Sequence, residues 1–138
     1  PGAMEALQAL SKAAQRTGIP ATTLELVNLR ASQINGCSVC LQMHARDLRK
    51  AGESDEKIDT VAGWRDAPHF DHAERAALAL TEAVTRLSDH SDPVPDDVYA
   101  EAAAHYDEQQ LGGLLLSISA INVWNRLNVS TRQVAGAW

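Results

Sequence analysis

Apolar and polar residues follow one another along this chain with the period of an α-helix. Apolar side chains recur at steps of three and four residues between clear stop signals, and no run shows the strict alternation of a half-buried strand. These positions predict helices over residues 3–16, 22–34, 37–51, 55–63, 74–87, 96–106 and 108–127. We therefore expect an all-α fold of six or seven helices, built as a single compact domain over residues 1–138.

Turn-forming residues mark the ends of the first three predicted helices. Gly18 and Pro20 follow the first helix, Asn35 and Gly36 follow the second, and Gly52 follows the third. Glycine readily adopts the conformation that ends a helix, and proline cannot continue one. The chain therefore bends sharply between its second and third helices.

Two adjacent glycines stand inside the last predicted helix. Gly112 and Gly113 each cost about 1 kcal/mol there relative to alanine. We expect that another helix, from this subunit or a second one, approaches the chain closely at this point.

Composition and charge exclude two classes of function. Hydrophobic residues make up 45% of the chain and charged residues 22%, with a formal net charge of −6. Because the chain is acidic and has no cluster of lysine and arginine, we do not expect it to bind nucleic acid. No apolar run reaches the roughly 20 residues that cross a bilayer, and none resembles a secretory signal peptide. We expect a cytoplasmic protein.

Both cysteines of the chain lie in one C-x-x-C motif at the predicted start of the third helix. Cys37, Cys40 and His44 have i, i+3, i+7 spacing, so a helix places all three on one face. The amides and dipole at a helix N-terminus favour the thiolate form of a cysteine, and His44 can accept the proton of Cys40. One sulfur can then react with an oxidant to form a sulfenic acid, and the other can close a disulfide.

Two other interpretations of this motif remain open. The cysteines can be inert, packed thiols. Alternatively, Cys37, Cys40 and His44 can bind zinc, with His69 or His72 as the fourth ligand. We favour redox chemistry because the chain has no second C-x-x-C motif. Outside a zinc site, His69 and His72 are expected to be plain surface or capping residues. The same expectation holds for His90 and His105.

Glu25 also has two interpretations. Thr22 and Glu25 have the spacing of a capping box, as do Asp71 and Glu74. Spacing alone favours the capping role for Glu25. The alternative is that Glu25 approaches His44, so that a carboxylate, an imidazole and a thiol form a proton relay.

The sequence resembles the alkylhydroperoxidase D-like (AhpD-like) family of the carboxymuconolactone decarboxylase superfamily. The similarity lies in residues 24–44, 62–65, 74–79 and 121–126. The family pattern is a glutamate twelve residues before a C-x-x-C motif and a histidine four residues after it. Glu25, Cys37, Cys40 and His44 match that pattern position for position.

The resemblance implies an AhpD-like all-α fold with the C-x-x-C motif at the start of a helix. It also implies trimers or hexamers, and thiol-dependent peroxidase chemistry without a metal or an organic cofactor. In that scheme Cys40 reacts with the peroxide, Cys37 resolves, and His44 and Glu25 relay the proton. Some members have a histidine directly before the second cysteine, where this chain has Val39.

Polar and aromatic residues cluster on the last predicted helix. We expect Asn122, Trp124, Asn125 and Arg126 to form a buried or subunit contact, and Trp64 to be a packing residue. The alternative is that Asn125 lines the thiol pocket.

The sequence thus predicts an antioxidant oxidoreductase that reduces a hydroperoxide or a similar small molecule. An external dithiol or redox protein would recycle it. The alternative is a redox-sensing or binding module without this activity, in which the Cys37–Cys40 disulfide acts as a switch.

Overall fold

The computed structural model describes residues 1–137, and this part of the chain is all-α, as the sequence predicts. Its seven α-helices are α1 (Ala3–Gln15), α2 (Ala21–Asn35), α3 (Ser38–Lys50), α4 (Asp55–Asp59), α5 (His72–Thr85), α6 (Asp96–His105) and α7 (Glu108–Ser130). Two 3-10 turns, η1 (Val61–Gly63) and η2 (Leu87–Asp89), follow α4 and α5. No helix within residues 1–137 combines the length and the apolar character needed to span a bilayer.

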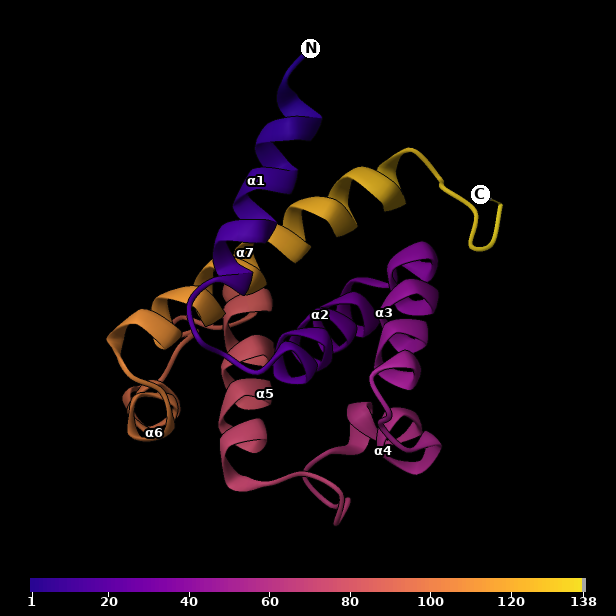
Figure 1. Cartoon of the computed structure of the whole chain (residues 1–138). Coiled ribbons are helices and arrows are strands. Elements are labelled where there is room, and N and C mark those ends of the chain that lie inside the picture. The colour runs from indigo at the N-terminus through magenta and orange to yellow at the C-terminus, as the bar shows by residue number, and fades with distance from the viewer. Residues whose placement is uncertain (138) are drawn as a thin grey trace.

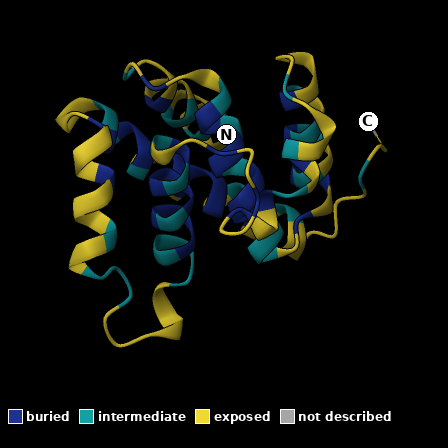
Figure 2. Ribbon diagram, turned by 90° about the horizontal axis from the view of Figure 1, so that it is seen from below, coloured by how far each residue is buried: buried dark blue, intermediate teal, exposed yellow. Residues whose placement is uncertain are grey.

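The helix α2 lies at the centre of the molecule, between α3, α5 and α7 (Figure 1). One part of the core joins α2, α5, α6 and α7 around Val27, Leu80 and Leu114. A second part joins α2 and α5 to α3, α4 and η1 around Leu26 and Leu48. Figure 2 shows the buried residues gathered where these helices meet. The interior positions of α2 and α5 therefore follow the apolar periodicity of the sequence.

The first helix departs from the sequence prediction in how it is buried. It packs against α7 and projects away from the remaining helices (Figure 1). Ala14 is its buried residue, whereas Met4 is 54% exposed, although the apolar spacing of Met4, Leu7 and Leu10 predicts that they form the buried side of this helix. One face of α1 is therefore free to border a cavity.

Several helix ends also differ from their predicted positions. α3 starts at Ser38, so Cys37 is its N-cap rather than a residue of its first turn. α7 continues to Ser130, three residues beyond the predicted end. The capping box predicted at Asp71 and Glu74 is confirmed. The one suggested for Thr22 is wrong, because α2 starts at Ala21 and has no side-chain cap.

The two adjacent glycines of α7 have different surroundings. A Cβ added to Gly113 would overlap the side chain of Thr17, in the turn after α1. A Cβ added to Gly112 would meet nothing within 4 Å. The close approach predicted from the sequence therefore occurs at Gly113, and a loop makes it rather than a helix.

Candidate active site

Cys37 and Cys40 form a disulfide at the N-terminus of α3. Gly36 ends α2 in a left-handed conformation (φ 69°), which lets the chain turn directly into α3. The backbone N–H of Cys40 donates to Sγ of Cys37 at 3.4 Å, so the sulfur itself caps the helix. Both cysteines are buried, with 2% and 1% of their surface exposed. The disulfide is thus held by backbone groups of a helix end.

His44 lies one turn after Cys40 and pairs with Glu25 of α2. Its Nδ1 lies 2.6 Å from Oε2 of Glu25. A carboxylate only accepts hydrogen bonds, so Nδ1 is the donor in this contact, and in the neutral imidazole the lone pair is then on Nε2. Within residues 1–137, this Nε2 is buried and has no hydrogen-bond partner. The geometry thus produces an oriented imidazole with a free basic nitrogen.

A cavity of about 980 Å³ adjoins this pair. Cys40, His44 and Glu25 lie in its wall, together with apolar residues of α2, α3 and α7. Cys37 is not part of this wall. The large cavity therefore gives a molecule from outside access to only one of the two sulfurs.

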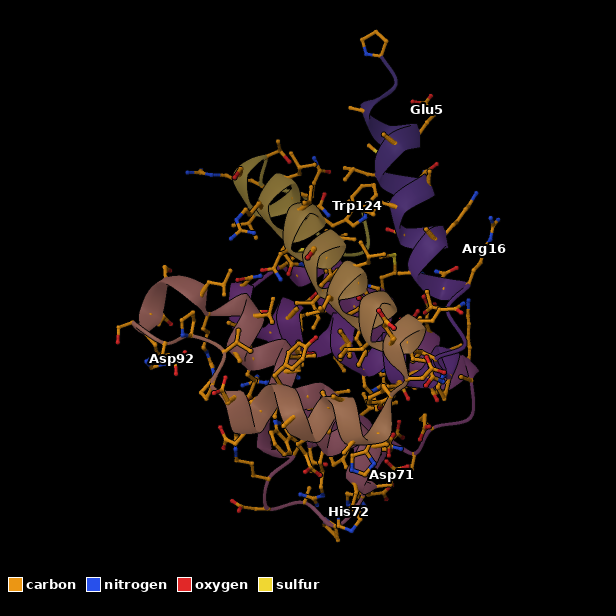
Figure 3. All side chains as sticks on the ribbon, turned by 90° about the vertical axis from the view of Figure 1, so that its left-hand side faces the viewer. Glu5, Arg16, Asp71, His72, Asp92 and Trp124 are labelled. Carbon is orange, nitrogen blue, oxygen red and sulfur yellow. A yellow bond between two sulfur atoms is a disulfide. The ribbon has the colours of Figure 1, made fainter. Side chains whose placement is uncertain are left out.

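Helix α1 closes one side of the large cavity. Ser11 and Lys12 of α1 line it, and Ser11 accepts a hydrogen bond at 3.2 Å from Nε1 of Trp124. Figure 3 shows Trp124 between α7 and α1. Trp124, for which we expected a buried or subunit contact, is half-buried and belongs to the cavity wall. Met4 of α1 borders this cavity and not the core, which explains why its predicted burial is wrong.

Asn128 is a site residue that the sequence did not suggest. Its Nδ2 lies 3.6 Å from Sγ of Cys40, and it lines the large cavity. Asn125, which the sequence suggested as a residue lining the thiol pocket, is fully buried and does not line the cavity. Its amide instead bonds to Asn35 and Ser32, at 3.0 and 3.1 Å. Asn128 was missed because it lies almost one helical turn further along α7, past the predicted helix end.

The part of the chain that the structure describes contains one group of side chains with the proximity of metal ligands. It consists of Glu25, His44 and Asp47, whose ligand atoms lie within 4.8 Å of one another. The zinc site considered from the sequence is not formed, because Cys37 and Cys40 are joined to each other. His72, one candidate for the fourth ligand, lies in Figure 3 at the other end of the molecule from Trp124.

A second polar cluster lies around Glu82 of α5, outside the cavity wall. Its Oε2 accepts from Nε of Arg30 at 2.8 Å and from Nε1 of Trp64 at 3.2 Å. Its Oε1 pairs with Arg65 at 2.7 Å. Burial alone would raise the pKa of Glu82, but the hydrogen bonds from these partners lower it below the usual value. Trp64 is buried, so its predicted packing role is confirmed, and the cluster ties α2 to α5.

A smaller cavity of about 160 Å³ lies beside the other sulfur. Cys37 and Ser38 line it at the start of α3, and Val129 and Arg132 line it from the last turn of α7 and the turn that follows. Asn128 is the only residue that borders both cavities among residues 1–137. Each cysteine of the disulfide therefore lines a different cavity.

The family model described as the carboxymuconolactone decarboxylase family matches residues 1–83. The uncharacterized protein YdfG of Bacillus subtilis is 38% identical over 130 residues, which cover 94% of this chain and 87% of YdfG. The alkyl hydroperoxide reductase AhpD of Bradyrhizobium diazoefficiens is 44% identical over 44 residues, which cover 32% of this chain and 24% of that protein.

One solved structure resembles the whole fold. It is a protein of unknown function from Agrobacterium tumefaciens, suggested to be the antioxidant defence protein AhpD. Its TM-score is 0.92 at 34% sequence identity, and the match covers 100% of this chain and 93% of that one. The predicted AhpD-like fold is therefore confirmed.

Proposed function

The chain belongs to the carboxymuconolactone decarboxylase family and has an AhpD-like fold, and from this premise we propose that it is a thiol-dependent hydroperoxide reductase. The observation that carries the proposal is the pair of Glu25 and His44 beside Cys40 in the wall of the large cavity. A carboxylate, an imidazole and a thiol in this order form a general arrangement for activating a sulfur nucleophile.

The reaction begins from the reduced dithiol. Nε2 of His44 takes the proton of the Cys40 thiol, while Glu25 stabilises the imidazolium that results. Nδ2 of Asn128 supports the thiolate from the other side. The N-terminus of α3 acts on the other sulfur, because Cys37 is the N-cap and accepts from the backbone N–H of Cys40. His44, Glu25 and Asn128 act on Cys40, which makes it the peroxidatic residue in our proposal.

The thiolate of Cys40 then attacks one oxygen of the hydroperoxide. The O–O bond breaks, Cys40 becomes a sulfenic acid, and the departing alkoxide takes the proton from His44 and leaves as an alcohol. The Cys37 thiol next attacks the sulfenic sulfur, its proton leaves with the hydroxyl group as water, and the disulfide forms. An external dithiol restores the reduced state by thiol–disulfide exchange.

The size of the large cavity favours an organic substrate. A volume of about 980 Å³ lies near the upper end of the roughly 300–1,000 Å³ typical of small-molecule sites. Its wall combines apolar side chains such as Leu24, Ile121 and Trp124 with about as many polar ones, so it offers apolar surface to an organic group. An organic hydroperoxide fills such a site better than hydrogen peroxide does.

Val39 limits the relay to one imidazole. It is buried directly before Cys40 and lines the large cavity, where some related proteins have a histidine. The proton of Cys40 therefore has a single acceptor in our proposal, His44, and Glu25 orients the imidazole of His44.

The proposal includes a homo-oligomer. Leu116, Val123 and Leu127 are exposed on α7 at spacings of seven and four residues, so they lie on one side of the helix. Exposed apolar side chains that gather on one face are typical of protein contacts. Light scattering of the purified protein tests this part of the proposal.

The test is hydroperoxide turnover with cumene hydroperoxide and excess dithiothreitol. Wild-type protein should consume the peroxide and return to the disulfide form, whereas Cys40→Ser should be inactive. Cys37→Ser, prereduced and then freed of dithiothreitol, should react once and accumulate the sulfenic acid, which dimedone traps. A wild-type protein that cycles between dithiol and disulfide without consuming peroxide would instead favour the redox-sensing alternative.

A further inference from the structure

We propose that the external dithiol attacks Cys37 through the small cavity, while the hydroperoxide reaches Cys40 through the large one. This inference rests on the proposed function and assigns an entry site to its reductant. Cys37 lines only the small cavity and Cys40 only the large one, with Asn128 between them. The two substrates then approach the same pair of sulfurs from separate cavities.

The choice of sulfur has a chemical consequence. In thiol–disulfide exchange the attacked sulfur forms the mixed disulfide, and the other sulfur leaves as a thiolate. Attack on Cys37 therefore releases Cys40, whose sulfur already faces Nδ2 of Asn128 at 3.6 Å. The leaving thiolate forms next to His44, in the cavity where the hydroperoxide will bind. Attack on Cys40 would instead attach the donor to the peroxidatic sulfur.

The complete exchange conserves atoms and electrons. A donor thiolate attacks Sγ of Cys37, the Cys37–Cys40 bond breaks, and Cys40 takes the electron pair. The second thiol of the donor, as a thiolate, then attacks the donor sulfur of the mixed disulfide. Cys37 leaves as a thiolate, and the donor leaves as a disulfide, two electrons more oxidised.

Arg132 supplies the charge that this site needs. It lines the small cavity in the turn after α7, where the N–H groups of Arg132 and Gln133 donate to the carbonyls of Val129 and Asn128 at 3.1 and 3.0 Å. This hydrogen-bond pattern is a helix-ending motif whose left-handed position usually holds glycine. Here Arg132 occupies that position with φ 55°. A strained backbone at this point is consistent with a functional role for the Arg132 side chain. Its positively charged guanidinium attracts the thiolate of the donor.

The dimensions of the small cavity restrict the donor. About 160 Å³ is below the volume of a typical small-molecule site, so it accommodates the end of a thiol chain rather than a whole bulky ligand. A small dithiol and the exposed cysteine of a redox protein share this chemistry. Comparing dithiothreitol with reduced thioredoxin as donors distinguishes the two sources.

The experiment measures the two half-reactions separately by stopped flow. Val129→Trp should fill the small cavity and slow reduction of the disulfide at least tenfold for either donor. Because the large cavity is not altered, oxidation of the prereduced protein by cumene hydroperoxide should stay within twofold of wild type. The neighbouring Ser130→Trp is the control, since Ser130 is exposed and lines neither cavity. Equal reduction rates for Val129→Trp and wild type would overturn the proposal.

Arg132→Gly separates function from stability. Glycine relieves the left-handed backbone, so the unfolding midpoint in urea should rise. Reduction by dithiothreitol should nevertheless slow about threefold to tenfold, and Arg16→Glu, at an exposed position that lines neither cavity, should leave that rate unchanged. A variant that is more stable and reduced at the wild-type rate would show that Arg132 plays no part in the site.

Mapping the mixed disulfide gives an independent result. Oxidised wild-type protein treated briefly with 2-mercaptoethanol and quenched in acid should carry the adduct on Cys37. An adduct on Cys40 would overturn the proposal. These measurements follow reduction alone, so they remain decisive even if the protein reduces no hydroperoxide.

Discussion

Replacing Glu25 with glutamine tests the relay most directly. Glutamine has almost the same size as glutamate but no negative charge, and its amide N–H can donate to Nδ1 of His44. That donation would move the imidazole proton to Nε2, the nitrogen that must accept the proton of Cys40. The variant therefore removes the basic site while the overall shape of the cavity is kept.

The expected loss follows from the contact between the two side chains. A hydrogen bond to a charged group contributes about 1.5–3 kcal/mol, and about 1.4 kcal/mol corresponds to a tenfold change in rate. Glu25 is 24% exposed, so solvent screens part of its charge. We therefore expect the second-order rate constant with cumene hydroperoxide to fall about tenfold to fiftyfold.

The assay is a single oxidation of prereduced protein, followed by stopped flow under excess hydroperoxide. Asp47→Asn is the matched control, because Asp47 is a cavity carboxylate near His44 without a hydrogen bond to it. Glu25 is partly exposed and glutamine keeps its size and its ability to form hydrogen bonds, so the free energy of unfolding should change little for Glu25→Gln. A rate loss below twofold, or an equal loss for Asp47→Asn, would refute the specific relay.

Three further predictions concern stability and the peroxidatic sulfur. Gly113→Ala should lower the unfolding free energy, because its Cβ would overlap the side chain of Thr17 in the turn after α1. Gly112→Ala should raise it by about 0.5–1 kcal/mol, and urea denaturation measures both changes. Glu82→Gln leaves a buried arginine without its counter-charge and should cost about 3–5 kcal/mol in the same assay. Because the pKa of Glu82 is lowered by folding, its contribution is present at neutral pH and is lost as the pH falls below about 4.5, so wild type and variant should converge in acid. Asn128→Ala should slow alkylation of reduced Cys40 by iodoacetamide about threefold to tenfold, since one N–H donor to the sulfur is lost. An unchanged alkylation rate would remove Asn128 from the site.

The amino-acid sequence alone determined the helices and the position of the redox motif. Apolar spacing within one helix is a local property, and turn residues such as Gly36 end a helix through their own backbone preferences. The capping box joins Asp71 to Glu74, only three positions further along the chain, so it could also be predicted from local sequence. The motif of Cys37 and Cys40 at a helix start followed from the same local signals.

Tertiary structure decided which groups act on the sulfurs. Glu25 had a local interpretation as a cap and a distant one as the partner of His44, nineteen residues away, and only the packing of α2 against α3 selects the second. Asn128 lies 88 residues from Cys40 in sequence and reaches it because α7 extends beyond its predicted end. Local periodicity does not encode such partners, because their distance depends on how whole helices cross. The sequence therefore determined the C-x-x-C motif at a helix start, whereas helix packing decided which residues lie beside each cysteine and which cavity each cysteine lines.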